Sequence, residues 1–138
     1  MSVFSDVRSA SRVRLLASAS VPDDQIAWEG VFFTPTPGTP YISEVIKPGP
    51  VKIAVAGGVE ATTEFSLNYT IHCPSGGGTR PLELIADAIH SAFRPGQWLS
   101  YGAHRASIQK CTRTEIRPEA DWMSCTVTAV VMAHTFEG

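Results

Sequence analysis

The sequence has no strong excess of charge of either sign and no long apolar segment. It contains 11 Lys and Arg residues against 13 Asp and Glu residues, which gives a formal net charge of −2. This balance argues against a dedicated nucleic-acid-binding protein, which normally carries a basic patch or stripe. No run of about 18 apolar residues is present, so we expect no membrane span. The first residues lack a basic segment followed by an apolar one, so we expect no secretory signal and a location in the cytosol or in something assembled there.

Cysteine is scarce. Cys73, Cys111 and Cys125 form an odd set without close spacing, and we expect buried free thiols. A metal site could be formed only by Cys73 beside His72. Because adjacent residues of a strand point to opposite faces, these two side chains would chelate poorly. We therefore expect no metal ion and no cofactor.

Sequence motifs of catalysis are also missing. There is no Gly-x-Ser-x-Gly elbow, no His-Glu-x-x-His pattern and no Cys-x-x-Cys pair. We expect His90 to be solvated on a helix surface. His72 and Asn68 share the polar face of a strand and could line a cleft, although a surface role suits them better. The sequence therefore does not indicate an enzyme.

The clearest pattern lies between residues 64 and 93. Apolar and polar side chains alternate over residues 64–73, which predicts a strand with one dry and one wet face. The apolar period then changes to three and four residues, which predicts an amphipathic helix that ends at Phe93. The dry strand positions are Phe65, Leu67, Tyr69, Ile71 and Cys73, and the apolar helix positions are Leu82, Ile85, Ala86, Ile89, Ala92 and Phe93. We expect this helix to lie across the dry face of its own strand.

The Gly-rich stretch between this strand and helix, residues 76–79, is a turn. A phosphate-binding loop would need a Gly-Lys-Ser/Thr at a fixed spacing, and no Lys is present here. Thr79 suits the N-cap of the helix and Pro81 suits its first turn.

The N-terminal residues 3–19 contain no Gly or Pro and predict a helix. Its modest inner stripe consists of Phe4, Val7, Ser11 and Leu15. Three arginines, Arg8, Arg12 and Arg14, are expected to stay solvated or to touch a partner.

A short strand over residues 26–33 is expected to lead into a Pro-rich elbow, which flanking aromatic residues anchor, and a further strand covers residues 41–47. Residues 48–62 form a possible projecting arm, in which Val51, Ile53 and Val55 alternate as in a strand. An apolar arm of this kind suits contact with another subunit, and an ordinary hairpin within one chain explains it equally well.

The C-terminal part predicts a long two-stranded ribbon. After a bend or short strand over residues 97–102, extended runs cover residues 104–117 and 122–136, with a turn at residues 118–121. The last strand should turn one row of side chains inward: Met123, Cys125, Val127, Ala129, Val131 and Ala133. A ribbon of this length spans over about 40 Å, whereas a helix of about 15 residues spans only about 22 Å. The overhang must curl or contact a neighbour.

Together these segments predict an α+β fold. We expect a mostly antiparallel sheet with an N-terminal helix and a central helix packed on one face. Residues 1–138 should form a single domain.

The order of segments resembles the tail terminator proteins of long-tailed phages, including a prophage-borne group of tail-completion proteins. The resemblance covers residues 3–134. The stretches that carry it are Ile26-Ala-Trp28-Glu-Gly-Val-Phe-Phe33-Thr-Pro35, Gly38-Thr-Pro40-Tyr41, Pro74-Ser-Gly-Gly-Gly78 and Ile85-Ala-Asp87-Ala-Ile-x-x-x-Phe93.

The resemblance implies a structural virion protein without an active site. Such proteins form a hexameric ring on the head-proximal end of the tail tube, stop tube growth and present a surface to the head-tail connector protein. The implied partners are copies of the chain itself, the tail tube protein and the connector, with DNA only as passing cargo and no membrane. The implied location is the tail neck of the virion, assembled in the bacterial host cytoplasm. The sequence lacks the acidic bias expected of a ring through which DNA passes.

We expect the subunit contacts to include Val51, Ile53, Val55, Trp98 and Tyr101. Two alternatives remain. One is another neck or tail component, either a head-closure or a tail tube protein. The other is a small-molecule-binding or catalytic domain that uses the face of Asn68 and His72.

Overall fold

The computed structural model describes residues 3–18, 21–54, 59–102 and 104–137, except for the side chains of residues 50–61 and 135–137. Its elements are α1 (Val3–Ala17), a 3-10 turn η1 (Asp23–Gln25), β1 (Ile26–Ala27), β2 (Tyr41–Ala54), β3 (Val59–Pro74), α2 (Arg80–Ala92), β4 (Trp98–Tyr101), β5 (His104–Arg113), β6 (Arg117–Glu119) and β7 (Trp122–Glu137). No helix in the described part of the chain is both long and apolar enough to cross a membrane.

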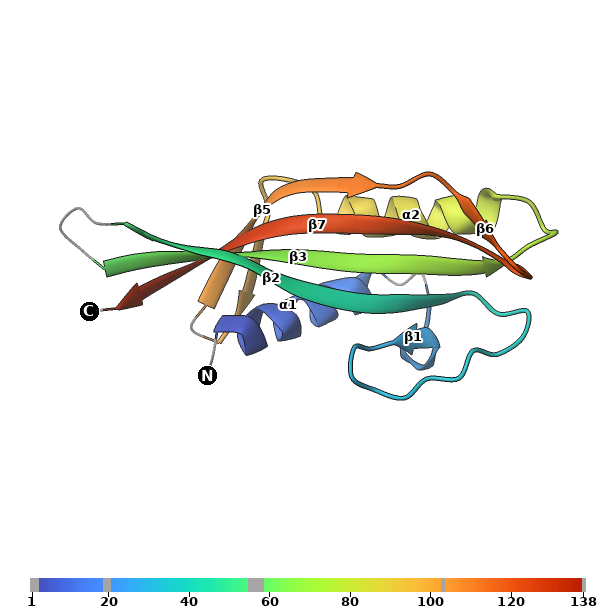
Figure 1. Ribbon diagram of the computed structural model, residues 1–138, viewed down its shortest axis with the longest axis horizontal. Coiled ribbons are helices and arrows are strands. Elements are labelled where there is room, and N and C mark those ends of the chain that lie inside the picture. The colour runs from blue at the N-terminus through green and yellow to red at the C-terminus, as the bar shows by residue number, and fades with distance from the viewer. Residues whose placement is uncertain (1–2, 19–20, 55–58, 103, 138) are drawn as a thin grey trace.

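The strands form one sheet in the order β1-β2-β3-β7-β5-β4, and β6 pairs with β7. Every one of these pairings is antiparallel except that of β1 with β2. The sheet curls into a half-barrel, with the long strands β2, β3 and β7 running side by side (Figure 1). This confirms the α+β class and the mostly antiparallel sheet.

The dry face predicted for β3 is the centre of the core. All five of its alternating apolar side chains are buried, and they pair across the sheet with the inward row of β7. In this register Phe65 lies opposite Val131 and Tyr69 lies opposite Val127. The inward row predicted for β7 is therefore confirmed.

Helix α2 follows the Gly-rich turn as predicted and buries Leu82, Ile85, Ala86 and Ile89. Phe93 caps its C-terminal end, and the Phe93 ring lies 5.4 Å from that of Tyr69. Thr79 does occupy the N-cap position, but its side chain makes no capping hydrogen bond. Its backbone is already helical, whereas a capping hydroxyl needs an extended backbone to reach the free N–H groups.

Helix α1 also contacts the core. Val7, Ala10, Ser11 and Leu15 are buried, and the Phe4 ring meets that of Phe65 edge to face at 5.3 Å. The sequence did not predict the burial of Asp6, whose carboxylate bonds Nδ1 of His104.

The first strand is much shorter than expected: β1 covers two residues instead of residues 26–33. Side chains replace the strand pairing beyond it. The Glu29 carboxylate accepts a hydrogen bond from the N–H of Ile46, and the Glu44 carboxylate accepts one from the N–H of Glu29. Gly30, at φ +83°, then turns the chain away from the sheet.

Of the region 48–62, the structure describes residues 48–54, which continue β2, and residues 59–62, which begin β3. Strand β2 continues past Pro48 with a register shift before Val51, and it pairs with β3 as far as Ala54. Gly49 permits this irregularity, because a Cβ there would lie 3.2 Å from the carbonyl oxygen of Glu64. The outer end of β3 pairs in turn with β7, so three strands extend beyond α1 (Figure 1).

Candidate functional site

The residues predicted to contact a neighbouring subunit fall into two separate groups. Trp98 and Tyr101 lie on β4 and expose 43% and 42% of their surface. Val51 and Ile53 lie in the outer half of β2, where the side chains are not among those described, and Val55 lies outside the described residues altogether. Because β2 and β4 stand near opposite ends of the strand order, the structure does not bring the two groups together.

Exposed apolar side chains of α1 extend the surface around β4. Val13 is 61% exposed and Leu16 is 40% exposed. We call Val13, Leu16 and Tyr101 the α1–β4 patch. Trp98 belongs to the opposite face of the sheet, because its neighbour Leu99 faces the core and its own ring lies 5.9 Å from that of His134. A cavity of about 200 Å³ opens within this patch and is lined by Ala10, Val13, Arg14, Ala17, Leu99, Ser100 and Tyr101.

Arg14 places positive charge beside the α1–β4 patch, and Arg105 lies on the opposite face of the sheet. Arg14 donates hydrogen bonds to the carbonyl oxygens of Ala92 (3.0 Å) and Trp98 (2.8 Å) and to Oε1 of Gln97 (2.7 Å). The Arg105 guanidinium lies 4.6 Å above the Trp98 ring. Arg14 was expected to stay solvated or to touch a partner; instead its half-buried guanidinium bonds three acceptors within the chain, at the end of α2 and the start of β4.

The β1–β2 loop, residues 28–40, carries the most exposed aromatic side chain in the described part of the chain. Phe32 is fully exposed, and Val31 beside it is 60% exposed. An open hollow of about 610 Å³ adjoins the loop, and its lining includes Asp23, Asp24 and Phe32. Sequence reasoning missed this site, although three consecutive apolar residues after Gly30 cannot all face one core.

Contacts on both sides of Phe32 hold the loop in place. Nε1 of Trp28 donates to Oδ1 of Asp23 at 2.8 Å, and the Arg12 guanidinium lies 5.0 Å above the Trp28 ring. On the other side, the Phe33 ring lies 5.2 Å from that of Tyr41. The elbow is thus anchored by aromatic residues, as expected, while Phe32 itself stays outside.

A buried carboxylate ties α1 to the β2 edge. The side chain of Glu44 is fully buried and lies 2.7 Å from Nη2 of Arg12 and 3.5 Å from Nη1 of Arg8. Arg8 also pairs with Glu29 at 2.7 Å. The hydrogen bond to Glu44 raises the pKa of Arg12, so the guanidinium stays charged. Arg8 and Arg12, also expected to stay solvated or to touch a partner, form ion pairs within the chain that hold the helix against β2.

The polar face of β3 forms bonds across strands. His72 stacks on the Tyr41 ring at 4.3 Å and lies 3.3 Å from the Glu119 carboxylate. Burial lowers the pKa of His72. Asn68 accepts a hydrogen bond from the Thr128 hydroxyl at 2.9 Å. The other ring nitrogen of His72, Nε2, lies 3.1 Å from the Ser43 hydroxyl. Side chains of neighbouring strands thus hold both His72 and Asn68 within the sheet face.

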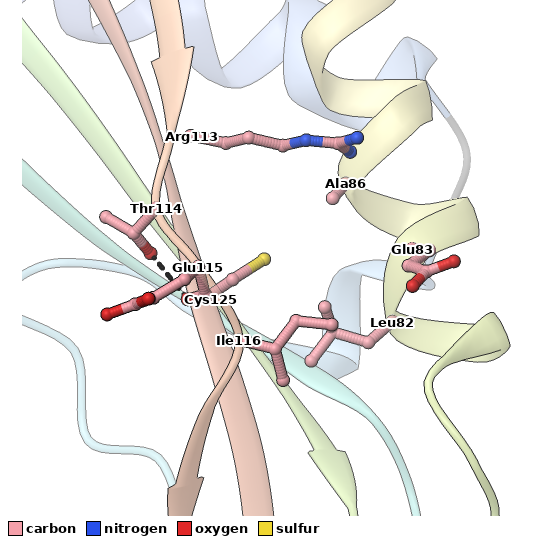
Figure 2. Close-up of a pocket in the computed structure, with 8 residues that line it drawn as sticks. All are labelled: Leu82, Glu83, Ala86, Arg113, Thr114, Glu115, Ile116 and Cys125. Atoms are coloured by element: carbon pink, nitrogen blue, oxygen red, sulfur yellow. Dashed lines mark hydrogen bonds between the residues drawn. The ribbon is translucent and has the colours of Figure 1, made fainter.

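A small cavity of about 160 Å³ lies between α2, residues 113–116 and Cys125 (Figure 2). Cys125 turns its sulfur toward this space, and burial raises the pKa of its thiol, which keeps the group protonated. Arg113 crosses the rim to pair with Asp87 at 2.6 Å. Small-molecule sites usually measure about 300–1,000 Å³, so the cavity suits a packing gap better than a ligand.

The histidine and cysteine side chains described next have structural contacts within the fold. His90, expected to be solvated, bonds the carbonyl oxygen of Cys111 at 3.2 Å. All three cysteines are free, and burial raises the pKa of Cys73 to about 11. Within the described ranges, no three His, Cys, Asp or Glu residues are grouped so as to hold a metal ion.

Comparisons with known proteins were made for the sequence and for the fold. A family model described as phage tail terminator protein matches residues 6–129. No curated protein matches the sequence. One solved structure, whose title states no function, has a TM-score of 0.70 at 18% identity and covers 96% of this chain and 95% of its own. A chain from a structure titled "Virion of native gene transfer agent (GTA) particle" has a TM-score of 0.60 at 18% identity, with 98% and 99% covered.

Proposed function

This chain belongs to the phage tail terminator family, and from that premise we propose that it closes the head-proximal end of a phage tail tube as a ring of identical copies, most simply a hexamer. It is a structural protein of the phage tail, and its family is not an enzyme family. In the proposed role the ring stops addition of tube subunits and joins the tail to the head connector, after assembly in the host cytoplasm.

The observation that carries this proposal is the family match over most of the chain, from residue 6 to residue 129. The exposed surfaces support it independently. Apolar side chains stand out at both ends of the strand order, on the β1–β2 loop and on the α1–β4 patch. A monomeric protein seldom exposes several large apolar side chains in this way. A subunit of a ring, in contrast, needs two different surfaces that bind its two neighbours.

We further propose how the protomer is arranged for this role. Residues 1–138 form one domain, and both helices cover the same dry face of the half-barrel. This leaves the polar face of β3 and β7 for the wet surface of the ring, and DNA passes only as cargo through the lumen. The arm at residues 48–62 projects to a neighbouring subunit, with Val51, Ile53 and Val55 at that contact and with Trp98 and Tyr101 at another.

The mass of the purified protein and its binding to tube ends test this function. We expect native mass spectrometry to give a closed oligomer and negative-stain images to show rings, both free and at one end of purified tail tubes. Tube protein incubated with the ring should stop elongating, whereas an unrelated ring protein of similar size should not stop it. A strict monomer that ignores tube ends would contradict the proposal.

Another neck or tail component is the second candidate. The virion-derived structure favours it to the same degree, because its title names the whole particle and no single component. The two functions differ in what the pure protein builds. Open-ended tubes would indicate a tube protein, and a ring that binds the connector but ignores the tube would indicate a head-closure protein.

A further inference from the structure

We propose that the β1–β2 loop of one copy docks on the α1–β4 patch of the next copy, with Phe32 seated in the cavity between α1 and β4. This inference rests on the proposed ring and specifies which surfaces close it.

The first argument is apolar complementarity. Phe32 is fully exposed although Trp28 on one side of it and Phe33 on the other are anchored. The α1–β4 patch exposes three apolar side chains, and two of them, Val13 and Tyr101, line a cavity of about 200 Å³. A cavity of about 150 Å³ already accommodates benzene, so the volume suits one phenyl ring. Burying an aromatic anchor in a pocket is the usual way in which an interface gains most of its affinity.

The second argument is charge. The hollow beside Phe32 is lined by the carboxylates of Asp23 and Asp24. Arg14 lines the cavity of the patch. Two acidic residues thus adjoin Phe32, with Arg12 over the Trp28 ring on another side of the hollow, whereas the one charged residue that lines the cavity of the patch is basic. This complementarity favours the loop of one copy against the patch of another over loop against loop or patch against patch.

The third argument is position. The β1–β2 loop follows β1, at one end of the strand order, and the patch includes β4, at the other end. A contact between two different surfaces of identical chains is head-to-tail, and such contacts close into a ring when the rotation permits. A pairing of like surfaces would give only a dimer.

Cross-linking tests the contact directly. The double variant Phe32→Cys with Val13→Cys, treated with a short bis-maleimide, should give a ladder of covalent oligomers that ends at the ring size. Each single variant should give no ladder and thereby controls for the native cysteines. Cross-linked dimers from Phe32→Cys alone would indicate a symmetric contact and would overturn the proposal.

A charged substitution tests the energy of the contact. Phe32→Asp should weaken ring assembly by at least about thirtyfold, the effect of losing an interface hot spot, while its melting temperature stays that of the wild type. Leu84→Asp is the matched control, because Leu84 on α2 is also exposed (55%) but lies outside both surfaces. A Phe32→Asp ring of unchanged affinity overturns the docking, even if that ring no longer caps tubes, since Phe32 would then serve the tube protein. A wild-type protein that is monomeric at all concentrations would instead remove the proposed function.

Discussion

At the scale of single residues, a buried ion pair and an exposed ion pair should contribute very differently to the free energy of unfolding. Glu44 is fully buried between Arg8 and Arg12, whereas Asp87 pairs with Arg113 in the open. Glu44→Gln leaves two cations without their buried partner, and we expect it to lower the free energy of unfolding by about 2–4 kcal/mol. Asp87→Asn should cost less than about 1 kcal/mol. Urea titrations with equal slopes would measure both, and equal losses would contradict this account of the network.

Ala120 has the backbone of a glycine. It lies in the turn between β6 and β7 at φ +55°, where a Cβ crowds the following carbonyl group. Ala120→Gly should therefore raise the free energy of unfolding by about 0.5–1 kcal/mol, and Ala120→Val should lower it. Thermal melts of the two variants beside the wild type would test the sign, and a glycine variant that melts lower would show that the turn is not strained.

His72 should make the protein less stable in acid. Burial lowers its pKa from 6.5, so between pH 6.5 and the folded pKa the unfolded chain binds the proton more readily than the folded chain. Stability is thus complete above pH 6.5 and falls as the pH falls below it. His72→Gln should flatten this slope. Ser43→Ala removes a hydrogen-bond partner of the ring but leaves the ring to titrate, so it should keep the slope.

At the scale of elements, the arm offers the test that the sequence first suggested. Strands β2 and β3 pair along it as far as Ala54, while the described residues of β2 beyond Ser43 have no strand partner on their other edge. We expect Ile53→Asp to weaken ring assembly without changing the melting temperature, because a subunit contact there would bury an unpaired charge at about 3–5 kcal/mol. Lys52→Asp, on the opposite face of the same strand, is the matched control. Equal assembly of both variants would place the arm away from the interface.

Elements with regular patterns were predictable, and those governed by distant side chains were not. The alternation in β3 and β7 and the helical period of α2 predicted which side chains are buried. Such a prediction is possible because all the residues on one side of a regular element face the same core, so the pattern repeats many times. The end of β1 depends on Glu29 and Glu44 replacing strand partners, which no local pattern reveals. The same limit applies to the candidate site. Trp98 and Tyr101 were predicted as subunit contacts, whereas Phe32 was placed in a strand over residues 26–33, and only the structure shows that it lies in an exposed loop.

At the scale of the whole molecule, α1 connects the two edges of the half-barrel. Arg8 and Arg12 bind it to the edge at β2, and Arg14 binds it to the edge at β4. The helix therefore holds in register the two edges that carry the proposed ring contacts. A ring subunit needs this rigidity, because a small change in the angle between its two sides changes how many copies close the circle.

This role of α1 predicts a local and separable effect of Arg14. In the dilute monomer, Arg14→Gln should speed amide hydrogen exchange in β4 and lower the free energy of unfolding by about 1.5–3 kcal/mol, because hydrogen bonds from a charged donor are lost. Exchange in β3 and β7 should stay slowest in both proteins, since each of these strands pairs on both sides. Arg80→Gln, at the exposed start of α2, is the control and should change neither quantity. If β4 exchanged at the wild-type rate in Arg14→Gln, the helix would not be what holds that edge, and ring size would have to be set by the sheet alone.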